Sequence, residues 1–70
     1  MDYTVVIRKA PDGIFIASCP SIPEVHTQGE SYKECLSHVK EAIELALEYR
    51  KEQGEEIPKE MGTEKIRVAL

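Results

Sequence analysis

The sequence of 70 residues has no long run of apolar residues. A membrane-spanning helix needs about 18 or more consecutive, mainly apolar residues, and no stretch of this chain approaches that length. The first residues, MDYTVVIRKAPDG, also lack the basic region, the apolar segment and the small-residue cleavage site of a secretory signal peptide. We therefore expect a cytoplasmic protein that does not bind a membrane.

Sequence motifs for binding phosphate or zinc are also missing. Neither the P-loop pattern nor the glycine-rich dinucleotide-binding pattern occurs, and no cysteines have Cys-x-x-Cys spacing. The two cysteines, Cys19 and Cys35, are expected to be reduced thiols, because disulfides are rare inside cells. A zinc site made of Cys19, His26, Cys35 and His38 is the alternative, but helical spacing directs Cys35 toward a core and His38 toward its flank. We expect no metal and no cofactor.

The basic residues do not form a cluster. The formal net charge is -4, and all of this excess lies between Glu30 and Glu56, where eight carboxylates accompany four basic side chains. Contact with phosphates needs Lys and Arg in clusters, so this segment is not expected to bind nucleic acid. An acidic segment instead favours a basic protein as partner.

Alternating apolar and polar residues predict three strands in the first part of the chain. The first covers 2–9, and the turn APDG, with Gly13 at positive φ, joins it to a second over 14–19. The second strand is apolar on both faces, as expected for a central strand. A short third strand is predicted over 25–28. Pro20 and Pro23 lie just before it, and because proline is tolerated only in edge strands or at the first residue of a strand, this strand is expected at a sheet edge or to begin after the prolines.

A long helix is predicted next, followed by a last strand. Ser31 and Glu34 form a capping box, and the helix continues to about Gln53, where Gly54 ends it. The last strand is predicted over 65–70. One stripe of the helix faces the core at the 3.6-residue spacing; it comprises Tyr32, Cys35, Leu36, Val39, Ala42, Ile43, Ala46 and Leu47.

These elements predict one α+β domain over 1–70 with the order β-β-β-α-β. A helix between two strands makes a right-handed crossover, which returns the last strand to the sheet. One helix covers one face of a four-stranded sheet. The other face and the sheet edges are then available to a partner, and a homodimer formed through one of them is expected because a domain this short is marginal alone.

The ordered set of motifs resembles the HicB-like antitoxin family. The family pattern has an Asp-Gly turn, a Pro-x-Ile/Leu-Pro-Gly loop, a Thr-x-Gly-Asp/Glu-Thr/Ser segment and a helical Glu-Ala-Ile/Leu. In this chain these positions are Asp12 and Gly13; Pro20, Ile22 and Pro23; Thr27, Gly29, Glu30 and Ser31; and Glu41, Ala42 and Ile43. Two residues depart from the pattern, since Glu24 replaces the loop glycine and Cys35 replaces a common alanine.

The resemblance implies a partial RNase H-like fold with sheet order 3-2-1-4 and one packed helix. It also implies direct binding and neutralisation of a HicA-type mRNA interferase toxin, a small basic protein. Nuclease activity is not expected, because two-metal chemistry needs converging carboxylates and neither the interior of the first strand nor KIRVAL contains one. The 70 residues leave no room for the DNA-binding domain of longer HicB antitoxins, so direct DNA binding is not expected.

The residues expected at a partner interface lie on the outer flank of the helix: His38, Glu41, Leu45, Glu48 and Tyr49. The polar corner CPSIPEVHTQGES is interpreted as a structural motif, with its main positions at Pro20, Pro23, His26, Thr27, Gly29 and Ser31. Two alternatives remain open. One is a HicB-like domain without a toxin, with a regulatory or ligand-binding role. The other is a small metal-dependent hydrolase that uses His26.

Overall fold

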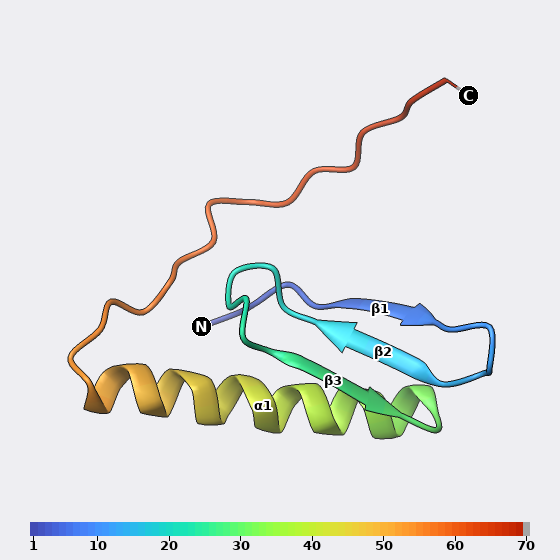
Figure 1. Cartoon of the computed structure of the whole chain (residues 1–70). Coiled ribbons are helices and arrows are strands. Elements are labelled where there is room, and N and C mark those ends of the chain that lie inside the picture. Colours follow the sequence, from blue (N-terminus) through green and yellow to red (C-terminus); the bar gives the residue numbers. More distant parts are fainter. Residues whose placement is uncertain (70) are drawn as a thin grey trace.

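A computed structural model describes residues 1–69. Its elements follow the order β1 (Val6–Lys9), β2 (Phe15–Ser18), β3 (His26–Gly29) and α1 (Tyr32–Glu52). The strands form one antiparallel sheet in the order β1-β2-β3 (Figure 1). The prediction of a central second strand and an edge third strand is confirmed.

The turn between β1 and β2 forms as its sequence predicts. Gly13 has a φ of 91°, and its backbone N–H donates to the carbonyl of Ala10 at 2.9 Å. The Asp12 carboxylate accepts from the backbone N–H of Ile14 at 3.0 Å. Glycine adopts this positive φ without steric cost, so the hairpin closes at this position.

The first strand is shorter than predicted. It begins at Val6, which pairs with Ser18, so that Thr4 in the same register would lie opposite Pro20. Proline has no N–H to donate to a ladder and here starts a turn. The sheet pairing therefore ends at Val6, although Tyr3 and Val5 still pack against the core.

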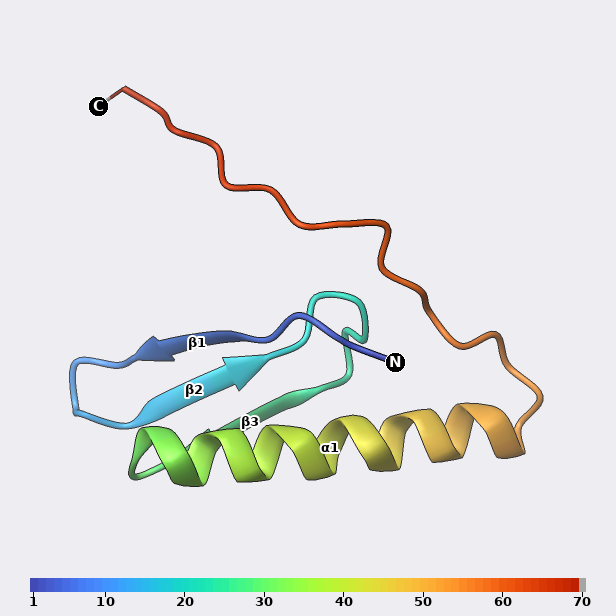
Figure 2. The same cartoon turned by 180° about the vertical axis from the view of Figure 1, so that it is seen from behind.

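α1 lies against one face of the sheet and covers it unevenly. It contacts β3 and β2 and leaves β1 uncovered (Figures 1 and 2). The core lies between α1 and the sheet, and its buried members are Ala17, Cys19, Ile22, Val25, Cys35 and Val39. Cys35 and Val39 belong to the predicted helix stripe, whereas Tyr32 and Leu36 at its N-terminal end remain partly exposed.

The predicted fourth strand over 65–70 is not formed in the part of it that the structure describes. Residues 65–69 have no strand assignment, and the segment after α1 leaves the body of the domain (Figure 1). Leu70 lies outside the described residues. The described sheet therefore has three strands, and its β1 edge is not paired with another strand.

Candidate functional site

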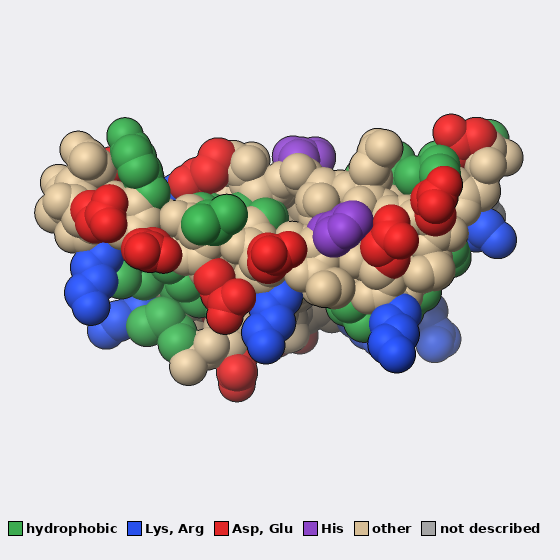
Figure 3. Space-filling model, turned by 90° about the horizontal axis from the view of Figure 1, so that it is seen from below, with side chains coloured by type: hydrophobic (Ala, Val, Ile, Leu, Met, Phe, Trp, Pro, Cys, Tyr) green, Lys and Arg blue, Asp and Glu red, His purple; other side chains and the backbone are tan. Residues whose placement is uncertain are grey.

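The outer side of α1 presents the residues predicted for a partner interface. His38, Glu41, Leu45, Glu48 and Tyr49 are all exposed, with Leu45 at 66% and Tyr49 at 59% of their surface. Steps of three or four residues from His38 to Glu41, to Leu45, and from Leu45 to both Glu48 and Tyr49 place them along one side of the helix. Figure 3, which looks onto this side, shows acidic side chains interspersed with apolar ones. The surface joins an apolar pair, Leu45 and Tyr49, to surrounding carboxylates.

His38 also contacts the sheet. Its Nδ1 lies 2.7 Å from the backbone carbonyl oxygen of Gln28 in β3. A carbonyl oxygen can only accept, so Nδ1 carries the proton in this contact. The imidazole thus joins α1 to the edge strand β3, a function that the sequence pattern did not indicate.

The corner between β2 and β3 consists of two successive turns. The N–H of Ile22 donates to the carbonyl of Cys19, and the N–H of Val25 donates to that of Ile22, both at 2.9 Å. Pro20 and Pro23 each occupy the second position of one turn, where their fixed φ is favourable. The turns direct Ile22 and Val25 into the core.

Glu24, which departs from the family pattern, has a partner in α1. The Arg50 guanidinium donates to the Glu24 carboxylate from Nε at 3.0 Å and from its terminal nitrogen at 2.7 Å. These hydrogen bonds lower the pKa of Glu24 and raise that of Arg50. Glu24 does not need the positive φ that a glycine could adopt. The pair links the corner to the end of the helix.

Gly29 ends β3 against the first turn of α1. A Cβ atom at this position would lie 2.6 Å from the backbone nitrogen of Cys35 and 2.9 Å from its Cα. Real Cβ atoms essentially never approach backbone atoms so closely. Gly29 is therefore required for the close approach of strand and helix. Thr27, two residues earlier, lies half-buried in β3.

The residues considered for zinc or hydrolase chemistry are not brought together. Cys19 and Cys35 are buried free thiols in the core, and His38 is bonded to the sheet. His26 lies exposed on β3, where it lines a shallow hollow with Ile16, Thr27 and Gln28. Within residues 1–69, no group of three or more His, Cys, Asp or Glu side chains is placed to hold a metal ion.

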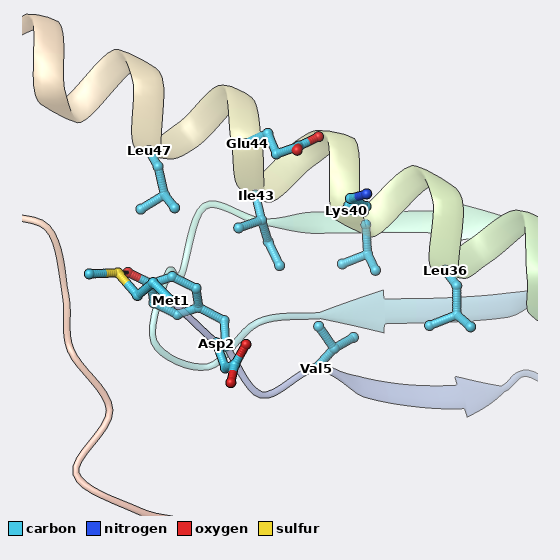
Figure 4. A pocket seen from close by; sticks show the side chains of 10 residues that line it. Met1, Asp2, Val5, Leu36, Lys40, Ile43, Glu44 and Leu47 are labelled. Atoms are coloured by element: carbon cyan, nitrogen blue, oxygen red, sulfur yellow. Dashed lines mark hydrogen bonds between the residues drawn. The ribbon is translucent and has the colours of Figure 1, made fainter.

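An apolar groove lies between α1 and the N-terminal segment, and the sequence pattern did not indicate it. Its volume is about 680 Å³, and Leu36, Ile43 and Leu47 extend into it from α1 opposite Met1 and Val5 (Figure 4). The groove exists because α1 covers β3 and β2 but not the β1 side.

The segment after α1 is fixed to the start of the chain before it leaves the domain. The Glu60 carboxylate accepts from the Thr4 N–H at 2.6 Å, from the Thr4 hydroxyl at 2.5 Å and from the Ser21 hydroxyl at 3.1 Å. The Tyr3 hydroxyl donates to the carbonyl of Pro58. The hydrogen bonds from Thr4, its hydroxyl first, hold the pKa of Glu60 below its ordinary value.

Among the helices of residues 1–69, none has the length and apolar character to cross a membrane. No family model matches the chain. A UPF0150 protein of Thermoplasma acidophilum is 41% identical over 64 residues, which are 91% of this chain and 93% of that protein. A UPF0150 protein of Archaeoglobus fulgidus is 48% identical over 57 residues, which are 79% and 83% of the two chains.

Similarity also extends to proteins named as antitoxins. Antitoxin HicB of Escherichia coli K12 is 38% identical over 58 residues, which are 83% of this chain but only 42% of that antitoxin. The crystal structure of the N-terminal domain of Burkholderia pseudomallei antitoxin HicB superposes with a TM-score of 0.80 at 27% identity. The match covers 90% of this chain and 74% of that one. The α+β arrangement of three antiparallel strands and one helix is therefore shared with that domain.

Proposed function

Because the chain belongs to the HicB-like antitoxin family, with UPF0150 proteins among its relatives, we propose that it is the antitoxin of a toxin–antitoxin pair. It neutralises a HicA-type mRNA interferase toxin by binding it directly. It acts in the cytoplasm as a non-catalytic protein. The observation that carries this proposal is the similarity to named antitoxins over 83% of this chain in sequence and 90% in structure.

The outer side of α1 is the proposed toxin-binding surface. A small basic toxin is attracted by the excess of carboxylates between Glu30 and Glu56, which speeds encounter and selects against acidic partners. Leu45 and Tyr49 provide the apolar contact that the carboxylates cannot provide. Aromatic side chains at the centre of an interface often contribute a large part of its binding energy.

The sheet is proposed to gain the remaining features of a partial RNase H-like fold. Within residues 1–69 no strand pairs with the outer edge of β1, and a strand there would complete the expected order 3-2-1-4. Self-association as a homodimer through this sheet edge is part of the proposal. A free edge is a template for pairing with another strand, which supports its use as an interface.

Binding to the small basic proteins encoded beside the gene tests the toxin assignment. We expect one of them to copurify with this chain and to lose its toxicity to host cells when the two are expressed together. Replacing Leu45 with Asp is expected to weaken the complex at least about tenfold, because it places a charge in an apolar contact. Titration calorimetry measures the change.

Met61→Asp is the matched control, because Met61 is fully exposed and lies outside α1. This variant should bind the toxin as the unchanged chain does. Glu41→Lys with Glu48→Lys should slow association most at low salt, where screening is weak. Equal toxin binding by the Leu45→Asp and Met61→Asp variants would contradict the assigned surface, and no relief of toxicity by the unchanged chain would contradict the antitoxin function.

A further inference from the structure

The groove between α1 and the start of the chain presents apolar surface beside an unpaired strand. Val5 lies on one side of it and Ile43 and Leu47 on the other (Figure 4). β1 pairs with β2 on one edge only, within the residues that the structure describes. A strand added at the free edge of β1 would direct alternate side chains into the groove.

The C-terminal segment has the pattern of such a strand. Ile66 and Val68 alternate with Lys65 and Arg67, so that the apolar side chains share one face. Ile66 is 82% and Val68 69% exposed, because the segment extends away from the domain. Two β-branched residues at strand spacing without a packing partner indicate a strand whose sheet lies elsewhere.

The register of the chain prevents this segment from filling the groove of its own domain. Glu60 is bonded to Thr4, and a parallel strand continuing from this point would reach Lys65 where β1 ends at Lys9. Ile66 would pass beyond the strand, roughly 20 Å along the chain from Glu60 at about 3.3 Å per residue. The groove, however, lies beside Tyr3 and Val5, close to the Glu60 contact.

The type of contact at Thr4 leads to the same conclusion. The Thr4 N–H, which points away from β2, donates its hydrogen bond to the Glu60 carboxylate and not to a backbone carbonyl of a neighbouring strand. The backbone at Glu60 is thus held away from β1 by the length of a side chain. A ladder between β1 and the segment that follows in the same chain does not begin there.

We propose that the part of the groove nearest β1, lined by Val5 and Leu36, is filled by Ile66 and Val68 of a second copy of this chain. The backbone of residues 65–69 of that copy pairs with the free edge of β1 over Val6–Lys9, beyond the contact of Thr4 with Glu60. The exchange is reciprocal, because a two-fold axis closes the assembly with two copies, whereas one-way exchange would give a larger ring or an open filament. Lys65 and Arg67 then lie on the face of the added strand that points away from the groove, so that only apolar side chains enter it. This deepens the proposed self-association and does not depend on toxin binding.

The oligomeric state of the full chain is the first test. Light scattering coupled to gel filtration should give twice the 7.9 kDa of one chain. Ile66→Asp should give the mass of one chain, since it places a carboxylate in each of two grooves and raises the dissociation constant about a hundredfold. Ala69→Asp is the control, because it places the same charge on the opposite face of the segment and should leave the dimer intact.

Cross-linking then distinguishes exchange between copies from contact within one copy. Light and heavy isotope-labelled chains are mixed, allowed to exchange and treated with a short amine-reactive linker. Lys65 and Lys40 should be joined in peptides that combine a light and a heavy chain, because Lys40 lines the groove. This experiment uses the unchanged chain, so it does not depend on how any variant folds.

Three results would overturn the proposal. They are a monomeric mass for the unchanged chain, a dimer that Ile66→Asp leaves intact, and Lys40–Lys65 links formed only within chains of the same label. A failure here leaves toxin binding by the helix surface unaffected, whereas loss of toxin binding with an intact exchanged dimer would contradict only the antitoxin function. The two proposals are therefore tested separately.

Discussion

At the scale of single residues, Gly29 has a steric role that the sequence pattern does not indicate. From the sequence, Gly29 is expected to break the chain between the third strand and the helix. In the structure its φ is not positive, so conformational freedom does not explain why a glycine is needed there. Its importance comes from the missing side chain, because the backbone of Cys35 occupies the space where a Cβ would lie. The close approach allows β3 to turn directly into α1.

We expect Gly29→Ala to lower the free energy of unfolding by roughly 1–3 kcal/mol, because the added methyl group overpacks the junction. Urea unfolding followed by far-UV circular dichroism measures the change. Gly62→Ala is the matched control, since a Cβ there meets no atom within 4 Å, and it should change the free energy little. Equal stability of the two variants would contradict the steric role of Gly29.

A second residue-scale finding concerns Glu24. Its place in the loop departs from the family pattern, and the sequence offers no reason for the change. The structure provides one, because Arg50, distant in sequence, donates two hydrogen bonds to its carboxylate. The pair is solvent-accessible, so salt screens it and it acts mainly to orient the corner relative to α1.

At the scale of elements, α1 is defined at both ends by local sequence. The Ser31 hydroxyl accepts from the backbone N–H of Glu34 at 3.1 Å, and the Glu34 carboxylate accepts from the N–H of Glu30. The predicted box is thus present with one difference, since the carboxylate reaches one residue further back than Ser31. At the other end, Gly54 with a φ of 71° donates to the carbonyl of Lys51, which terminates the helix.

Replacing Ser31 with Ala should lower the free energy of unfolding by about 1 kcal/mol, because the Glu34 N–H loses its acceptor. Thermal unfolding measures the loss, and Ser37→Ala within α1 serves as the control. Ser37 is exposed and lies in the helix interior, where Ala has the higher helix propensity, so this variant should be as stable or slightly more stable. A Ser31→Ala variant as stable as the control would exclude a contribution from the cap.

At the scale of the whole molecule, Glu60 joins the C-terminal segment to the start of the chain. Its pKa lies below the ordinary value of 4.5, because Thr4 and Ser21 donate to the ionised carboxylate. A lowered pKa in the bound arrangement means that the contact contributes fully above pH 4.5. The contribution is lost as the pH falls through the lower pKa of the folded chain.

The Thr4 amide signal in NMR spectra should therefore titrate with a midpoint below pH 4.5 and indicate release of the segment at lower pH. Glu60→Gln removes the titrating group, so this transition should vanish in the variant. Glu64→Gln is the control, because Glu64 is an exposed carboxylate of the same segment, and the Thr4 titration should persist. A Thr4 titration that survives Glu60→Gln would disprove the assigned contact.

The sequence by itself determined the local structure and the family. The turn at Gly13, the central position of the second strand, the limits of α1 and the motif set follow from neighbouring residues, because turns, caps and periodicity depend on nearby chain positions. The sequence also indicated the apolar and acidic character of the outer helix side, since helical spacing groups Leu45 with Glu41 and Glu48.

Only the tertiary structure decided how the segments meet. The uneven cover of the sheet by α1, the groove beside Val5 and the pairing of Glu24 with Arg50 depend on distances between residues far apart in sequence. The same reason explains the predicted fourth strand. Alternation in residues 65–70 indicates a strand, but pairing requires a partner edge within reach, and the contact of Glu60 with Thr4 sets where the segment can go.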